Sequence, residues 1–247
     1  LTNPEAGWES VPFPSTPRRA LTVAAHRGKL YVVGGLLENG RTTRKVEVFD
    51  PALGTWSSGP ELPGEAIQGF APSAFSVGGQ LLASGGNGTV YRLSESGDSW
   101  ESLAQQVVPR ITHRLLPGMD EDVLMVGGNF AGVPVRWIES IPLSGRKGEP
   151  GVISWSVELP GQVEQSQAVG VMGSQVILAG GNRSRDPHAF SVENLSDEVV
   201  AVRVDGSEAE TLPSLPEARQ SGVFVRVPQG RGFANYLLGG IGADGEI

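Results

Sequence analysis

The stretch LYVVGG, residues 30–35, decides the fold because it is an apolar segment that runs directly into a pair of glycines. Four further segments have the same form, and the first glycines of successive pairs lie 51, 42, 53 and 59 residues apart. Self-similarity at about 50 residues indicates a repeat architecture. The paired glycines are Gly34, Gly35, Gly85, Gly86, Gly127, Gly128, Gly180, Gly181, Gly239 and Gly240.

A tryptophan recurs in phase with these glycine pairs. Trp56, Trp100 and Trp155 each follow a pair by 15 to 28 residues, and Trp8 holds the same phase before the first pair. Ala209 stands where the fourth repeat would carry its tryptophan. The tryptophans therefore mark a second position common to the repeats.

Each repeat contains apolar runs of strand length, and the run before each glycine pair is apolar throughout rather than alternating. Such a run indicates a strand that is buried on both faces. In the first repeat we expect strands near residues 20–25, 29–33, 45–49 and 55–58. A glycine pair permits positive φ and close backbone approach. A large indole ring would fill the wider gap between neighbouring sheets far from their closest approach.

These features resemble those of the kelch-repeat superfamily, and the resemblance covers essentially the whole chain. Phe49 takes the position of the aromatic residue that the family carries in the third strand of a repeat. The resemblance implies an all-β fold, a β-propeller in which four-stranded sheets, or blades, surround a central axis. It implies little about the ligand.

We expect a single propeller domain with four complete blades and partial blades at both ends. The predicted blades span residues 1–12 (an outer strand only), 13–63, 64–106, 107–160, 161–216 and 217–247 (partial). We interpret the chain as part of a propeller of six or seven blades. An open ring exposes sheet edges, so this piece is expected to aggregate or to bind something at its open end.

The composition excludes several classes of function. The net charge of −8 does not suit a nucleic-acid-binding protein, and no apolar run approaches the 18 residues of a membrane span. The absence of cysteine rules out disulfides and thiolate metal sites, and the three histidines show no metal-ligand spacing. We therefore expect no cofactor. The compartment stays open, with a secreted or cell-surface location favoured over a cytoplasmic one.

Residues just before each innermost strand should surround the central mouth of the propeller. Counted in register with the glycine pairs, they are Arg18 or Arg19, Gln68, Arg110, Gln165 and Arg219, with His113 nearby. In some kelch proteins, arginines at this position contact an acidic peptide. The other interpretation is that these side chains bind turn carbonyls or pair with nearby glutamates.

The longest loop, residues 182–198, is a candidate flap over the mouth, and it carries Arg183, Arg185, Asp186 and His188. Its other interpretation is a solvated surface loop. The face formed by these loops and the blade-to-blade turns is close to neutral on a strongly acidic chain, which favours an acidic ligand.

The resemblance leaves binding and catalysis open. Galactose oxidase shares the fold, but its copper site needs a tyrosine crosslinked to cysteine, and this chain has no cysteine. Sialic-acid mutarotases also have this architecture, and His113, Glu164 and the mouth arginines could act on an acidic sugar. The leading hypothesis is a non-catalytic module that binds a protein loop or a glycan at the mouth. A purely architectural repeat is a third.

Overall fold

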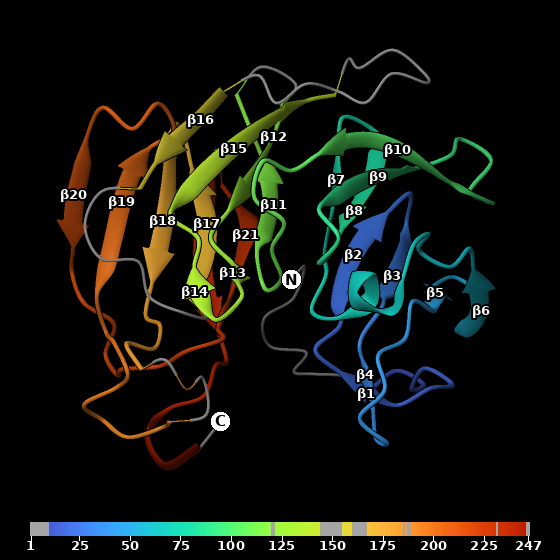
Figure 1. Cartoon of the computed structure of the whole chain (residues 1–247), viewed down its shortest axis with the longest axis horizontal. Coiled ribbons are helices and arrows are strands. Elements are labelled where there is room, and N and C mark those ends of the chain that lie inside the picture. The colour runs from blue at the N-terminus through green and yellow to red at the C-terminus, as the bar shows by residue number, and fades with distance from the viewer. Residues whose placement is uncertain are drawn as a thin grey trace.

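The computed structural model describes residues 10–119, 122–143, 155–159, 167–184, 186, 189–230 and 232–245. It confirms the all-β fold class, with 50% of the chain in strands and 3% in helices. Four four-stranded antiparallel sheets and one strand pair follow one another along the chain (Figure 1). Sheet 1 contains β2 (Thr22–His26), β3 (Lys29–Val33), β5 (Val46–Asp50) and β6 (Thr55–Gly59).

The remaining sheets repeat this order of strands. Sheet 2 contains β7 (Ser73–Val77), β8 (Gln80–Ser84), β9 (Thr89–Leu93) and β10 (Trp100–Gln105). Sheet 3 contains β11 (Arg114–Pro117), β12 (Asp122–Val126), β15 (Trp137–Pro142) and β16 (Trp155–Glu158). Sheet 4 contains β17 (Ala168–Met172), β18 (Gln175–Ala179), β19 (Val199–Arg203) and β20 (Ala209–Leu212). Sheet 5 is the pair β21 (Val223–Gln229) and β22 (Gly232–Leu238).

Two short strand pairs that the sequence did not predict lie beside the sheets. They are β1 (Arg18–Arg19) with β4 (Leu36–Leu37), and β13 (Asn129–Phe130) with β14 (Val133–Pro134). In the part of the chain that the structure describes, the helices are two 3-10 turns, η2 (Ala66–Gly69) and η3 (Ala243–Gly245). No helix in the described ranges is long and apolar enough to cross a membrane.

The apolar core lies between neighbouring sheets, as the expected burial of both strand faces requires. On β8, Leu81 packs into the cluster shared with sheet 1, and its neighbour Leu82 packs into the cluster shared with sheet 3. The same alternation occurs on β12, where Met125 packs toward sheet 2 and Leu124 packs toward sheet 4. Because successive residues of a strand face opposite sides, the second strands of sheets 2, 3 and 4 each join two cores, and these sheets stack face to face.

The innermost strands β2, β7, β11, β17 and β21 contact one another in that order. Thr22 pairs with Val33 and Arg114 pairs with Val126, so the start of each innermost strand and the end of the second strand lie at the same end of a sheet. We call this end the loop face. The strand pair β1–β4 and the hairpin β13–β14 both lie on it, and the pair β1–β4 is in the lower part of Figure 1.

Two tryptophans link neighbouring repeats through the same hydrogen bond. Trp56 Nε1 donates to the carbonyl of Pro12 (2.8 Å), and Trp100 Nε1 donates to the carbonyl of Pro60 (2.8 Å). Trp100 is 9% exposed, whereas Trp56 is only partly buried and packs against Phe49. Trp8 and the side chain of Trp155 lie outside the described residues.

The glycine pairs lie where the backbone meets the blade-to-blade loops. At Gly34, φ is 65°, and a Cβ atom would meet the carbonyl oxygen of Gly69 at 2.5 Å. Both requirements exclude a larger residue at this position. Gly85 and Gly86 have no positive φ, so the second pair is kept small by close approach alone: a Cβ on Gly86 would meet the side chain of Ile67 at 2.7 Å.

Candidate ligand-binding face

The centre of the loop face is bounded by residues in a strained backbone conformation. Ala20, Ala71, Thr112 and Ser221 each lie two residues before an innermost strand, and each has a φ between 43° and 61°. The amide of Ala71 donates to the carbonyl of Ala20, and that of Thr112 to the carbonyl of Ala71, both at 3.0 Å. This conformation is costly for residues other than glycine, and the hydrogen bonds hold it in place around the mouth.

Arg18 turns inward from this rim. Its side chain is 0% exposed, its Nε donates to the carbonyl of Gly34 (2.6 Å), and its Nη2 donates to that of Val32 (3.2 Å). It also forms an ion pair with Glu47 on β5, whose carboxylate accepts the amide of Ser15 (3.0 Å). The guanidinium group of Arg18 therefore ties three parts of sheet 1 together.

Arg110 makes the equivalent contacts in sheet 3. Its Nη1 donates to the carbonyls of Gly127 (3.2 Å) and Trp137 (2.8 Å), and its Nη2 pairs with Glu139 on β15. Both charged side chains are 0% exposed, and Glu139 also accepts the amide of Val107 (3.0 Å). Burial lowers the pKa of Arg110 to about 10, so it remains charged at neutral pH.

In sheet 2 the equivalent position is Gly69, and the residue before it, Gln68, makes comparable contacts without any charge. It is fully buried, its Nε2 donates to the carbonyl of Thr89 (3.3 Å), and its Oε1 accepts the amide of Asn87 (3.3 Å). Tyr91 stands on β9 where sheets 1 and 3 carry their glutamates. Gln165 lies outside the described residues.

His113 is enclosed beneath the rim. It is 0% exposed, and its Nε2 lies 2.5 Å from the hydroxyl of Ser84, which also accepts a hydrogen bond from Gln106 (3.0 Å). Burial, with a smaller contribution from the charges of Arg110 and Arg114, lowers the pKa of His113 to about 3. The imidazole is therefore neutral at physiological pH and has no access to solvent.

Arg19 and Arg219 are the mouth arginines that solvent reaches. Arg19 is exposed and forms no ion pair with the described residues. The side chain of Arg219 is 30% exposed, donates to the carbonyl of Gly239 (3.0 Å) and pairs with exposed Glu217 at 2.7 Å. A ligand at the mouth could therefore contact Arg19 and Arg219, whereas Arg18 and Arg110 are occupied by buried carboxylates.

The predicted flap is tied to the next sheet. Asn182 donates through Nδ2 to Oε1 of Gln220 (2.6 Å), which precedes sheet 5, and Arg183 lies 3.5 Å from Glu198. Asp186 is exposed. The two remaining members of the predicted set, Arg185 and His188, lie outside the described residues.

A patch of exposed apolar side chains surrounds the β13–β14 hairpin on the loop face. Phe130 is 52% exposed, Val133 64%, Trp137 40% and nearby Val107 68%. We call these four residues the hairpin patch. They adjoin a groove of about 230 Å³, which is lined by Val108, Phe130, Val133, Pro134, Val135, Arg136, Trp137 and Glu158.

Sequence reasoning missed Glu47, Glu139 and the hairpin patch. The two glutamates had a visible signal, since each is a lone acidic residue within an apolar strand, in VEVF and in WIESI. A carboxylate in such a strand needs a buried partner, and an arginine lies just before the first strand of each of these two repeats. The hairpin patch had no comparable signal, because a loop sequence does not show which of its apolar residues stay exposed.

The kelch motif family matches residues 17–63, which hold sheet 1 with its arginine and glutamate. The chain is also 31% identical over 100 residues to the F-box/kelch-repeat protein At4g39550 of Arabidopsis thaliana. It is 37% identical over 81 residues to Kelch-like protein 33 of Homo sapiens. The chain contains a kelch motif and is similar to kelch-repeat proteins.

The matches cover 39% and 33% of this chain, and only 24% and 14% of the two relatives. The similarity to the solved "Structure of YjhT" extends much further, over 97% of this chain and 82% of that one, with a TM-score of 0.73. At 16% identity it shows the fold alone, which is a kelch-type β-propeller.

Proposed function

We propose that this kelch-repeat chain is a non-catalytic binding module that recognises a protein loop on its loop face, at the hairpin patch beside the mouth. The observation that carries the proposal is the cluster of exposed Phe130, Val133 and Trp137 around a groove. Aromatic and aliphatic side chains gathered on a surface characterise the centre of protein interfaces. Loops held by a rigid scaffold are also where binding residues concentrate.

The charges around the patch favour acidic residues in the ligand. Arg19 and Arg219 are exposed toward the mouth, and Arg136 lies in the groove itself, 46% exposed and 3.4 Å from Glu158. An exposed ion pair of this kind is weak, so a ligand carboxylate can compete for the arginine. We therefore expect the preferred loop to combine an apolar anchor with acidic neighbours.

The enclosure of His113 supports binding over catalysis on an acidic sugar. A general acid or base must come within hydrogen-bonding reach of its substrate. His113 has no exposed surface, and its proton-accepting ability is reduced by a pKa of about 3. Glu164, its candidate partner, lies outside the described residues. The argument against catalysis therefore rests on the enclosure of His113 alone.

An array of defined peptides and glycans tests the proposal with three forms of the chain. Phe130→Asp is expected to weaken the peptide signals by about tenfold or more, because it places a charge in the apolar centre of the interface. Leu53→Asp is the matched control, since Leu53 is 73% exposed in the β5–β6 turn at the opposite end of sheet 1. An unchanged array profile for Phe130→Asp, or glycan signals alone, would refute the proposal.

A further inference from the structure

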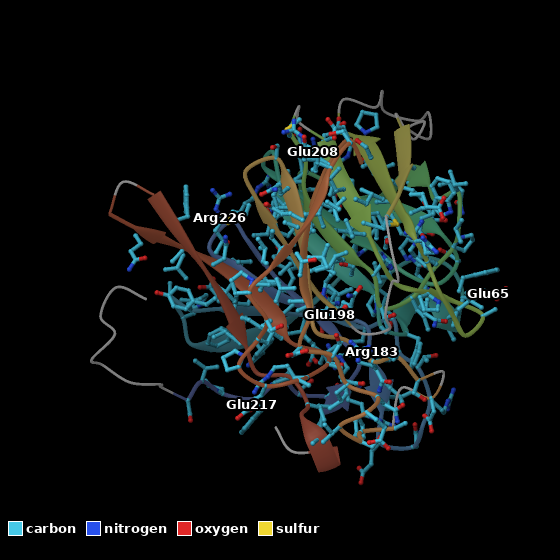
Figure 2. The ribbon with its side chains drawn as sticks, turned by 90° about the vertical axis from the view of Figure 1, so that its left-hand side faces the viewer. Glu65, Arg183, Glu198, Glu208, Glu217 and Arg226 are labelled. Atoms are coloured by element: carbon cyan, nitrogen blue, oxygen red, sulfur yellow. The ribbon has the colours of Figure 1, made fainter. Side chains whose placement is uncertain are left out.

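A second cavity lies at the end of the molecule opposite the loop face, which we call the far end. Glu208 marks the far end at the top of Figure 2, and Glu217 marks the loop face below. The cavity has a volume of about 810 Å³ and lies where the β2–β3 turn of sheet 1 meets the β7–β8 turn and the β9–β10 loop of sheet 2. Small-molecule sites commonly measure about 300–1,000 Å³, so this cavity has the size of such a site.

The walls of the far-end cavity are polar. Among the described residues that line it, Leu93 is the only one with an apolar side chain. Burial of apolar surface therefore contributes little to binding here. A ligand of this cavity must be recognised by hydrogen bonds and charge, unlike a ligand of the hairpin patch.

Arg27 supplies the cavity with a cation that lacks a carboxylate partner. Its Nη1 donates to the main-chain carbonyl of Glu95, across the boundary between sheets 1 and 2 (3.0 Å), and it forms no ion pair with any described residue. A guanidinium group carries five N–H donors, so most of its donors are left for a ligand. The other arginine of the lining, Arg92, already pairs with Glu101 at 3.0 Å.

The backbone at Arg27 is unfavourable for an arginine. Its φ is 47° and that of Gly28 is 75°, so the β2–β3 turn has positive φ at both central residues. Such turns favour Asn-Gly and Gly-Gly, and the β7–β8 turn of sheet 2 is indeed Gly78–Gly79, with φ of 55° and 74°. A residue held in a costly conformation beside a cavity indicates a role for its side chain.

The β7–β8 turn adds two main-chain donors to the same cavity. Gly78 and Gly79 both line it, and their amides donate no hydrogen bond within the described part of the chain. Successive amides of a tight turn can bind an anion. Together with Arg27 they provide donors for the several oxygens of a phosphate group.

The β9–β10 loop presents acceptors instead of donors. The hydroxyl groups of Ser94, Ser96 and Ser99 all donate to Oδ1 of Asp98, at 3.0, 2.7 and 3.0 Å. The oxygen of Ser94 also accepts the amide of Ser99 (3.2 Å), so the oxygens of Ser96 and Ser99 are left to accept from a ligand. Glu95 is exposed and lines the cavity beside them. This side of the cavity therefore suits hydroxyl groups and repels anions.

His26 adds a further polar atom to the wall. Its side chain is 5% exposed, and its Nδ1 lies 2.8 Å from the hydroxyl of Ser76. Its Nε2 has no hydrogen-bond partner among the described residues and is not fully enclosed, so a ligand in the cavity can reach it. Burial, with a smaller contribution from the charge of Arg27, lowers the pKa of His26, and the imidazole is neutral at pH 7.

We propose that the far-end cavity binds a soluble sugar phosphate, a small molecule rich in hydroxyl groups that carries one phosphate. Arg27 and the two glycine amides would hold the phosphate, and the serine oxygens and the imidazole of His26 would bind the hydroxyl groups. The net charge of −8 opposes approach to an anionic membrane, which favours a soluble ligand over a phosphorylated lipid headgroup.

Isothermal titration calorimetry with glucose 6-phosphate, glucose and inorganic phosphate tests the proposal. We expect glucose 6-phosphate to bind about tenfold more tightly than either of the others, because each of them lacks one of the two recognised features. Arg27→Asn should remove the preference over glucose without lowering the urea midpoint of unfolding, because Asn-Gly suits the turn. Arg203→Asn is the matched control, since the Arg203 side chain is 43% exposed at the far end of sheet 4, and it should leave binding unchanged. Bound ligand should slow hydrogen exchange at residues 78–79 and 94–99.

The inference is overturned if no probe binds, or if glucose binds as tightly as its phosphate. Equal binding of inorganic phosphate would reduce the cavity to a general anion site, and tighter binding to vesicles that contain a phosphorylated inositol lipid would assign it to a membrane lipid. A lower urea midpoint for Arg27→Asn would mean that Arg27 serves the fold and not a ligand. The Phe130→Asp chain should bind glucose 6-phosphate normally, which separates this site from the hairpin patch.

Discussion

In sheets 1 and 3 a buried arginine–glutamate pair holds the preceding blade-to-blade loop against the sheet. In sheet 2 one neutral glutamine holds the corresponding loop. Arg110 and Glu139 are both fully enclosed, and so is Gln68. The glutamine reaches the carbonyl of Thr89 and the amide of Asn87 without a charge. In sheets 1, 2 and 3 a buried side chain of the blade-to-blade loop therefore makes hydrogen bonds of this kind, from one position in sheets 1 and 3 and from the residue before it in sheet 2, and the two charged side chains each have a charged partner.

The residue in the blade-to-blade loop and the residue that faces it on the third strand differ together from sheet to sheet. Where the loop carries arginine, the third strand carries Glu47 or Glu139. Where the loop carries Gln68, the third strand carries Tyr91. A buried charge without a partner is costly, so the two positions cannot change independently.

The largest expected effect comes from removing one charge of the buried pair. Arg110→Met should lower the free energy of unfolding by about 3–5 kcal/mol, because it leaves Glu139 charged and enclosed. Gln68→Met in sheet 2 should cost about 1–3 kcal/mol, since it leaves only neutral groups without partners. Urea titration of both variants measures the difference. Equal losses would show that charge does not distinguish the two sheets.

The tryptophans give a second contrast between sheets 1 and 2. Trp100→Ala should cost about 3–5 kcal/mol, because this side chain is 9% exposed and large-to-small changes in a core cost that much. The sequence alone gives the same expectation for Trp56→Ala. The partial exposure of Trp56 now lowers that expectation to about 2 kcal/mol. Denaturant titrations that rank Trp56 above Trp100 would contradict the burial of these side chains.

Much of the fold could be predicted from the sequence because its signals are local. The apolar runs before the glycine pairs correspond to β3, β8, β12 and β18, and the four strands expected in the first repeat lie within two residues of those observed. The all-β class and the kelch resemblance are confirmed. The blade boundaries and the total number of blades stay predictions.

The candidate site was harder to predict because accessibility is not local. Arg18 and Arg19 are neighbours in the sequence, yet Arg18 is enclosed by Glu47 and Arg19 is exposed. Which of two adjacent arginines turns inward depends on a carboxylate 29 residues further along the chain. The same holds for Arg110 and Glu139. The spacing from the glycine pair shows which loop carries the arginine. Whether that arginine turns inward is decided by the residue on the third strand.

A double substitution can remove both charges from sheet 3, so that its loop is held without charge, as in sheet 2. Arg110→Gln or Glu139→Val alone leaves one buried charge, and each should be strongly destabilising. The double variant removes both charges, so its loss of stability should be smaller than the sum of the single losses by about 1–3 kcal/mol. A double-mutant cycle in urea measures this coupling. Additive losses would mean that the arginine and the glutamate act independently.

The smallest effect is the pH dependence that sheet 1 has through Glu47. Burial would raise the pKa of Glu47, but hydrogen bonds from Ser15 and Arg18 and the charge of Arg18 outweigh it and lower the pKa to about 2, from a usual value of 4.5. Because the folded-state pKa is lowered, its contribution is complete above about pH 4.5 and is lost as the pH falls toward 2. The unaltered chain should exceed Glu47→Gln in stability by about 1–3 kcal/mol at pH 7.

This difference should shrink steadily between pH 4.5 and pH 2, as followed by urea titration at each pH. Glu61→Gln is the control, since the Glu61 side chain is 61% exposed and its pairing with Arg44 is weak. Gln68 is a neutral amide, so Gln68→Met in sheet 2 should show a loss of stability that is constant with pH. A Glu47→Gln difference that stays constant down to pH 2 would mean that the carboxylate is not held by Arg18 in its charged form.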